Sequence, residues 1–189
     1  MPMTPDWKAV EEQLVETGLS ALRRFTVEHA DEICSFFAYA VDPYAAGYEV
    51  CLDIYTNGIR AAMQHERRTF GRRHEGAKRP QGWKQAHHWL DIPRIVDYTP
   101  SAGSFAFAGY ASGEIEQWEA YLTEDEKHPH KEDENSYLEG NWRIAIWRAI
   151  EQLIKMQAFD GLRLSSPFRL GYELHDEELV VLRILNWPT

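Results

Sequence analysis

The hydrophobic pattern of residues 141–159 predicts a long helix that packs into the core of the protein. Successive helical residues turn by about 100°, which places charged residues such as Arg148 and Lys155 opposite one broad apolar face. That face consists of Met156, Ala149, Trp142, Leu153, Ile146, Ile150, Ile154 and Trp147. A face of this width suits a helix that lies across a sheet, and Asp160-Gly161 is expected to end it.

The pattern near the N-terminus predicts a helix followed by two paired strands. Thr4-Pro5 has the form of an N-cap with proline at the first helical position, so we expect a helix from there to Glu28. Residues 33–41 are apolar on both faces, as a central strand would be. Residues 48–55 alternate between apolar and polar, which is typical of a half-buried strand. The short turn between these strands predicts an antiparallel hairpin.

Shorter apolar segments predict the remaining elements. These are a helix after Thr56 with Ile59, Ala62, Met63 and Phe70 inward, a strand at Ser104–Tyr110, a helix at Glu114–Leu122, and a closing hairpin of strands at Phe168–Leu174 and Leu179–Leu185. The small residues Ala106, Ala108 and Gly109 indicate that something packs closely against the third strand. The order α-β-β-α-loop-β-α-α-β-β predicts an α+β fold, with a mainly antiparallel β-sheet packed against helices.

Length and composition indicate one globular domain covering residues 1–189. A chain of 189 residues with 44% hydrophobic residues can bury a core without staples. Cys34 and Cys51 fall in predicted strands, so we expect two reduced, buried thiols rather than a disulfide or a nucleophile. No charged and apolar leader opens the chain, and no apolar run approaches the ~20 residues of a membrane span. We therefore expect a cytoplasmic protein with no membrane partner.

The histidine clusters are the first candidates for a metal site. His65-Glu66 begins like a zinc-protease helix, but Thr69 stands where the second imidazole would be. The other clusters are His87-His88 and His128-Pro129-His130. Neither has an obvious third ligand nearby in the sequence, and the four-ligand spacing of a structural metal site is not found. The sequence therefore predicts neither a metal site nor a cofactor.

Glu49 and Asp53 are candidates for acid and base chemistry. They lie on the same face of a predicted strand, and paired carboxylates can divide the two roles when one is desolvated. The wet face of an antiparallel sheet produces the same alternation, and we favour that interpretation. The sequence contains no Gly-rich phosphate loop, nucleophile elbow or Cys-His signature. No catalytic residue is therefore predicted.

Basic residues are concentrated between Arg60 and Lys84. This segment has eight basic and two acidic residues, a local balance of +6, within a chain of net charge −10. Its side chains could contact phosphates and Trp83 could stack on a base. A solvated helix surface is the commonest explanation of such a charge run, and a surface that faces the acidic part of the same chain is another. Nucleic acid is therefore not the partner that we favour.

Acidic residues are concentrated between Glu114 and Glu134, where nine carboxylates and two lysines give a balance of −7. Clustered carboxylates speed encounter with a cationic protein, and aromatic rings supply rigid contact area. The candidate partner-binding residues are Glu114, Glu116, Trp118, Glu119, Tyr121, Glu124, Asp125, Glu126, Glu132, Asp133 and Glu134. The alternative is an ordinary solvated loop.

The layout of the chain resembles a bacterial family of unknown function whose members are encoded near polymorphic toxin loci. The features that carry the resemblance are the N-terminal helix, the aromatic strand with the sequence FFAYAV at 36–41, the Thr56-Asn57 pair leading into a helix, the Trp-bearing middle, the long helix and the ending Arg183-Ile184-Leu185-Asn186-Trp187-Pro188. In that family the ending more often reads Arg-Leu-Asn-Pro, so this chain departs from it.

The resemblance implies an immunity-type protein, which binds a cognate toxin in the cytoplasm and blocks it. The acidic stretch would then meet basic groups of the toxin, with Trp118 and Tyr121 as anchors. The alternative function is a metal-assisted hydrolase, in which the fold brings His87 or His88 together with Glu49 or Asp53. A third possibility is nucleic-acid binding through the basic segment.

Overall fold

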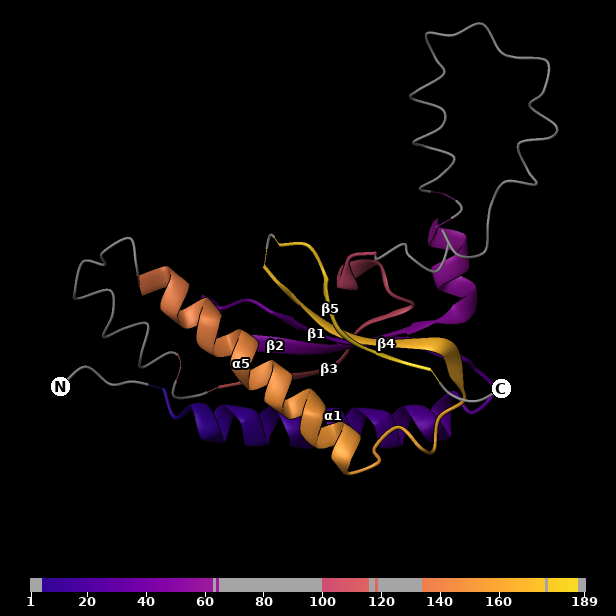
Figure 1. The fold of residues 1–189 in the computed structure, drawn as a ribbon, viewed down its shortest axis with the longest axis horizontal. Helices are drawn as coiled ribbons and strands as arrows, with labels where there is room; N and C mark the ends of the chain where they lie inside the picture. The colour runs from indigo at the N-terminus through magenta and orange to yellow at the C-terminus, as the bar shows by residue number, and fades with distance from the viewer. Residues whose placement is uncertain are drawn as a thin grey trace, which may run out of the picture.

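The computed structural model describes residues 5–62, 64, 100–115, 118, 134–175 and 177–186. The named elements are α1 (Trp7–Glu28), β1 (Cys34–Val41), β2 (Gly47–Ile54), η2 (Ala102–Ser104), β3 (Phe107–Glu114), α5 (Glu134–Lys155), β4 (Leu164–Leu174) and β5 (Val180–Leu185). The strands form a mixed sheet in the order β3-β2-β1-β4-β5, in which only β1 and β4 pair in parallel (Figure 1). The predicted α+β class is confirmed.

Strand β1 is the central strand of the sheet, as its apolar sequence predicted. It pairs with β2 as the predicted antiparallel hairpin and with β4 on its other edge. Phe37 and Tyr39 point towards α1 and α5, whereas Phe36 and Ala38 belong to a second apolar cluster on the opposite face. Both faces of β1 are therefore buried, which explains why its sequence shows no polar alternation.

Helix α1 begins later than predicted and ends where it was expected. Asp6, rather than Thr4, is the N-cap, because its Oδ1 accepts hydrogen bonds from the amides of Lys8 and Ala9 at 3.0 and 3.2 Å. The buried face of the helix packs on the sheet beside α5 and includes Val10, Leu14, Leu22 and Phe25. The last helical residue is Glu28.

Helix α5 has the predicted core face but different ends. Trp142, Ile146, Ile150 and Leu153 are fully buried, whereas Trp147 and Met156 are 44% and 54% exposed. Their predicted inward orientation is therefore wrong. Trp147 lies about 140° around the helix from Trp142, at the border of the apolar face. Met156 follows Lys155, the last helical residue.

A glutamine in the left-handed backbone conformation, rather than a glycine, ends α5. Gln157 has φ of 54°. The amides of Gln157 and Ala158 donate to the carbonyls of Ile154 and Leu153, which is the hydrogen-bond pattern of a Schellman motif. The chain therefore leaves the helix several residues before Gly161, and the predicted stop at Asp160-Gly161 is wrong. Glycine is the usual residue at this position because it has no Cβ. A glutamine there does not indicate the end of a helix, so the sequence did not predict it.

The third strand and the closing hairpin are present with shifted boundaries, and the two shorter predicted helices are described only in part. Residues 55–62 are helical and follow β2 directly, as expected, with Ala62 buried. The third strand runs over Phe107–Glu114 instead of Ser104–Tyr110, because Ala102–Ser104 forms the short 3-10 helix η2. The helix predicted from Glu114 lies mostly outside the described residues, although Trp118 is helical. The closing hairpin is confirmed as β4 and β5.

The apolar residues form a large cluster between the helices and the sheet, and a small cluster on the other face.

Cys34 and Cys51 are free and buried, as predicted. Burial raises the pKa of the Cys34 thiol to about 12 and that of the Cys51 thiol to about 11, so both stay protonated at neutral pH. None of the helices in the described ranges is both long and apolar enough to cross a membrane.

We expect Gly18→Ala in α1 to destabilise the protein, although alanine is the better helix former. A Cβ at Gly18 would overlap the Tyr39 hydroxyl and approach Leu153 Cδ1 to 3.0 Å. Overpacking of this kind costs about 1–3 kcal/mol, which exceeds the gain of about 1 kcal/mol in helix propensity. Urea unfolding would measure the change.

Gly140→Ala in α5 is the matched control. A Cβ at Gly140 meets nothing within 4 Å, so this substitution should stabilise the protein by about 0.5–1 kcal/mol. Adding Tyr39→Phe to Gly18→Ala should recover part of the loss by removing the overlapping oxygen. A stabilised Gly18→Ala protein would contradict the packing between α1 and β1.

Candidate functional site

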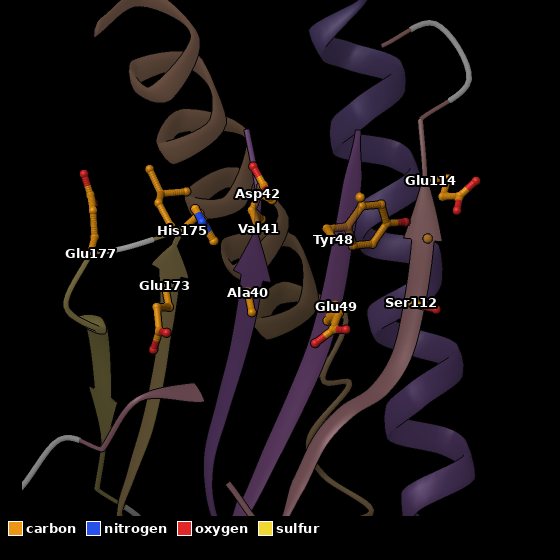
Figure 2. A pocket seen from close by; sticks show the side chains of 13 residues that line it. Ala40, Val41, Asp42, Tyr48, Glu49, Ser112, Glu114, Glu173, His175 and Glu177 are labelled. Atoms are coloured by element: carbon orange, nitrogen blue, oxygen red, sulfur yellow. The ribbon is translucent and has the colours of Figure 1, made fainter. Parts of the chain in front are cut away.

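An acidic groove lies on the face of the sheet opposite the two long helices. It has a volume of about 580 Å³, within the size range of small-molecule and side-chain binding sites. Its lining consists of Ala40, Val41, Asp42, Gly47, Tyr48, Glu49, Ser112, Gly113, Glu114, Glu173, Leu174, His175 and Glu177. Figure 2 shows α1 and α5 behind the strands, with Glu49 and Glu173 on the near side.

Strand register aligns the floor of the groove. Ala40 of β1 pairs with Glu49 of β2 on one side and with Glu173 of β4 on the other, and Glu49 pairs with Ser112 of β3. These residues form one row across four strands (Figure 2). Neighbouring strands are about 4.8 Å apart, so the Cα atoms of Glu49 and Glu173 are separated by roughly 10 Å. The methyl group of Ala40 leaves the space between the two carboxylates open.

The carboxylate of Glu173 is held by the segment that contains η2. Its Oε1 accepts a hydrogen bond from Ser101 Oγ at 2.9 Å, and its Oε2 accepts one from the Ala102 amide at 2.6 Å. Ala102 is fully buried, so its amide depends on this partner. Glu173 therefore has a fixed position in the groove and also a structural role.

Glu49 lies across the floor from Glu173 and is exposed. Its carboxylate packs over Gly109 of β3, where an added Cβ would lie 3.3 Å from the carboxylate atoms. Gly109 also has φ of 60°, which favours glycine. The small residues of β3 indicated close packing in the sequence, and at Gly109 the packed group is the Glu49 side chain.

The rim of the groove adds three more carboxylates and an imidazole. Glu177 pairs with Arg143 of α5 at 2.6 Å, and Asp42 Oδ1 accepts a hydrogen bond from the Tyr44 amide at 2.9 Å. The amide of His175 donates to the Val41 carbonyl, which joins the end of β4 to the end of β1. Among the described residues, the lining contains five carboxylates and neither lysine nor arginine. A concave surface of this kind focuses a negative potential.

The structure tests only part of the predicted partner-binding set. Glu114 ends β3 and lines the groove. The members outside the described residues are Glu116, Glu119, Tyr121, Glu124, Asp125, Glu126, Glu132 and Asp133, and of Glu134 only its place at the start of α5 is described. The predicted interface is therefore represented in the described groove by one residue.

Trp118 is a core residue, so its predicted role as a surface anchor is wrong. Its side chain is fully buried. Its ring packs against Trp7 and Trp142 with centroid distances of 5.4 and 5.3 Å, and its Nε1 donates to the Pro43 carbonyl at 2.8 Å. An indole with both its ring and its N–H satisfied inside the protein offers no contact area to a partner.

The two carboxylates of β2 differ in their environments. Glu49 lies on a wet face, as predicted, whereas Asp53 is only 2% exposed, so the same prediction is wrong for Asp53. Burial raises the pKa of the Asp53 carboxyl above its ordinary value, although hydrogen bonds from Ala106 and Asn57 act in the opposite direction. The segment around Ala106 covers this end of the strand, which alternation along β2 alone does not reveal.

Sequence reasoning missed most of the groove. It identified Glu49 as a possible functional residue and placed Glu177 in the turn of the closing hairpin, but it did not bring them together. Their proximity follows from the parallel pairing of β1 with β4. The polar positions Glu49 and Glu173 were the available signal, since each lies between apolar neighbours in its strand.

The predicted histidine clusters lie outside the described residues, namely His65, His87, His88, His128 and His130. Within the described ranges, no group of three or more His, Cys, Asp or Glu side chains could hold a metal ion. Comparisons of the chain with protein-family models, with curated proteins and with solved structures find no match. The chemistry of the groove therefore follows from its own residues.

We expect Glu173→Ala to lower the free energy of unfolding by about 2 kcal/mol. The substitution leaves the buried Ala102 amide without its carboxylate partner, and hydrogen bonds to charged groups contribute about 1.5–3 kcal/mol. Urea unfolding would measure the loss. Glu49→Ala is the matched control on the other side of Ala40 and should change stability by less than about 0.5 kcal/mol. Equal losses in the two variants would contradict the structural role of Glu173.

Proposed function

We propose that this protein is a non-catalytic binding protein that engages a cationic surface of a partner protein through the acidic groove. The observation that supports this proposal is the lining of the groove, which among the described residues has five carboxylates and neither lysine nor arginine. A cation that enters the groove meets carboxylates from both sides of Ala40. Specific protein contacts of this kind add electrostatic attraction to shape.

The geometry of the floor favours a long basic side chain. Glu49 and Glu173 are about 10 Å apart at their Cα atoms, two strands from one another. An arginine that extends over Ala40 can donate to both carboxylates, because a guanidinium carries five N–H donors in a planar fork. Glu173 already accepts two hydrogen bonds, yet a carboxylate offers about four acceptor sites. Both acids therefore remain available to a partner.

Charge outside the groove supports fast association. The chain carries a net charge of −10, which attracts a basic protein from a distance and falls off with salt. Glu114 belongs both to the groove lining and to the acidic stretch that ends at Glu134. We therefore propose that the groove and the carboxylates of that stretch act as one acidic surface.

We further propose that the partner is a toxin and that the protein neutralises it in the cytoplasm. This step rests on the resemblance in layout to a family associated with toxin loci, and on the agreement of an acidic binder with a basic toxin. The mechanism is occlusion, in which the protein covers a surface that the toxin needs for its action. It requires tight, charge-complementary binding and no chemical step.

The hydrolase alternative requires His87 or His88 to meet Glu49 or Asp53. Both histidines lie outside the described residues. Asp53 is buried beneath Asn57 and Ala106, so only Glu49 of this pair faces a groove that a substrate could enter. No contact among the described residues favours hydrolysis over binding.

We expect neutralisation of the groove to weaken binding of a cationic probe. The groove variant Asp42→Asn/Glu49→Gln removes two charges and keeps the acceptor that caps Tyr44. Isothermal titration with an arginine-rich peptide should give an affinity for this variant about tenfold lower than for the unmodified protein, a difference of about 1.4 kcal/mol. The salt dependence of binding should also become shallower.

The matched control is Asp31→Asn/Glu32→Gln, which removes two charges from the turn before β1, at the opposite end of that strand from the groove. A loss that is equal or larger in this control would show that net charge, rather than the groove, governs binding. An uncharged peptide of the same length should not bind. Chemical-shift changes of the backbone amides at Ala40, Glu49 and Ser112 would place the peptide in the groove.

The toxin proposal has a separate expected outcome. A partner captured from the native cells at equimolar ratio should inhibit growth when expressed alone, and co-expression of this protein should restore growth. The groove variant should restore growth less well, because the complex is weaker. A captured partner that is harmless when expressed alone would contradict the immunity function, while leaving the groove as a binding site.

A further inference from the structure

Asp53 is a buried carboxylate that joins three segments of the chain on the groove-bearing face of the sheet. It lies on β2, at the opposite end of the strand from the groove. Its Oδ1 accepts hydrogen bonds from Asn57 Nδ2 at 2.8 Å and from the Ala106 amide at 3.0 Å. Asn57 Nδ2 also donates to the Ser104 carbonyl at 3.2 Å. The start of helix 55–62 and the segment 101–106 are thus attached to the sheet at one carboxylate.

The second carboxylate oxygen faces glycine and serine rather than water. A Cβ built on Gly58 would lie 3.3 Å from Asp53 Oδ2 and 3.8 Å from Ser35 Oγ. Ser35 is 4% exposed, and its hydroxyl is buried without a hydrogen-bond partner. The absence of a side chain at Gly58 lets the helix start close to the carboxylate. The negative charge is therefore held where few groups can solvate it.

The titratable groups that interact with Asp53 come from β1, the strand next to β2, and from β4, the strand beyond it. Arg169 of β4 attracts the carboxylate, and the Cys34 thiol of β1 lies within its electrostatic influence. The covering segments 57–58 and 101–106 contain no titratable side chain. Burial outweighs the attraction of Arg169 and the hydrogen bonds, so the pKa of Asp53 is raised.

We propose that Asp53 is a proton-sensitive clamp, whose protonation tightens the attachment of helix 55–62 and segment 101–106 to the sheet. Oδ1 can accept the two hydrogen bonds in either charge state, so protonation at Oδ2 removes the cost of burying the charge and keeps the contacts. The clamp gives a response to pH to the face of the sheet that also carries the groove.

The direction of the effect follows from linkage. Because the folded pKa lies above the unfolded value of about 3.8, the closed clamp binds a proton more readily than the open one. Its extra stability is fully present below the unfolded pKa and is lost as pH rises through the folded pKa. Above the folded pKa, ionised Asp53 therefore holds the two segments less tightly than protonated Asp53 does.

The clamp has a route to the groove. Segment 101–106 is held by Asp53 through the Ala106 amide at one end and by Glu173 through Ser101 and Ala102 at the other. Glu173 also lines the groove. A change in the attachment at Asp53 thus reaches a groove carboxylate through six residues of chain.

Hydrogen exchange of the unmodified protein and of Asp53→Asn tests the proposal. Asparagine keeps the oxygen acceptor but is neutral at every pH. After correction for intrinsic exchange rates, the protection of the amides in 55–62 and 101–106 should fall in the unmodified protein as the pH rises from about 3.8 through the folded pKa of Asp53. In Asp53→Asn it should stay constant, and above that transition it should exceed the protection of the unmodified protein several-fold. The same pH dependence in both proteins, or weaker protection in the variant, would overturn the clamp.

Gly58→Ala provides a second test that keeps the carboxylate. Its Cβ would crowd Asp53 Oδ2 and exclude water further, so the midpoint of the pH transition should move to higher pH. Gly140→Ala controls for helix propensity and Glu49→Gln controls for charge on the same strand face, and neither should move the midpoint. An unchanged or lowered midpoint in Gly58→Ala would also overturn the proposal.

Discussion

The burial of β1 on both faces and along both edges is the constraint on which the rest of the structure depends. Its backbone groups pair with β2 on one side and with β4 on the other, which satisfies polar groups that would otherwise be costly to bury. Phe37 and Tyr39 fix the position of the helices, and the Tyr39 hydroxyl donates to the Leu14 carbonyl of α1. Phe36 and Ala38 hold the segment with η2 on the other face. The groove lies where this second apolar cluster ends and the polar row through Ala40 begins.

Local periodicity predicted the elements of this fold well, because hairpins and amphipathic helices are encoded by residues close in sequence. The β1–β2 and β4–β5 hairpins and the core face of α5 follow from spacing alone. The parallel pairing of β1 with β4 does not, since no local pattern specifies which distant strand completes a sheet. For that reason Glu49 and Glu173 could not be placed on either side of Ala40. Trp118 was misplaced for a related reason: its acidic neighbours in sequence suggested a surface, but Trp7 and Trp142 enclose it.

The groove brings several negative charges close together, and separate hydrogen bonds or ion pairs stabilise individual carboxylates against their mutual repulsion. Glu173 accepts hydrogen bonds from the segment with η2, Glu177 pairs with Arg143, and Asp42 caps the Tyr44 amide. Each of these three carboxylates is thus stabilised by a group outside the groove lining, and a carboxylate with about four acceptor sites can accept further hydrogen bonds. A cation that binds among them relieves repulsion as well as making new contacts. Asp53 differs, because its charge is enclosed rather than presented to the groove.

The parallel pairing of β1 with β4 also determines the order in which the sheet can form while the chain is being synthesised. Cys34 of β1 pairs with Leu164 of β4, so the ribosome must synthesise most of the chain before the central strand gains its second neighbour. Until then the backbone N–H and C=O groups along one edge of β1 have no native partner, a state that favours association with other strands. The β1–β2 hairpin and α1 can form early, whereas the mature sheet waits for the last strands. This order makes the formation of the β4–β5 hairpin the step that separates a partly folded nascent chain from one with a complete sheet.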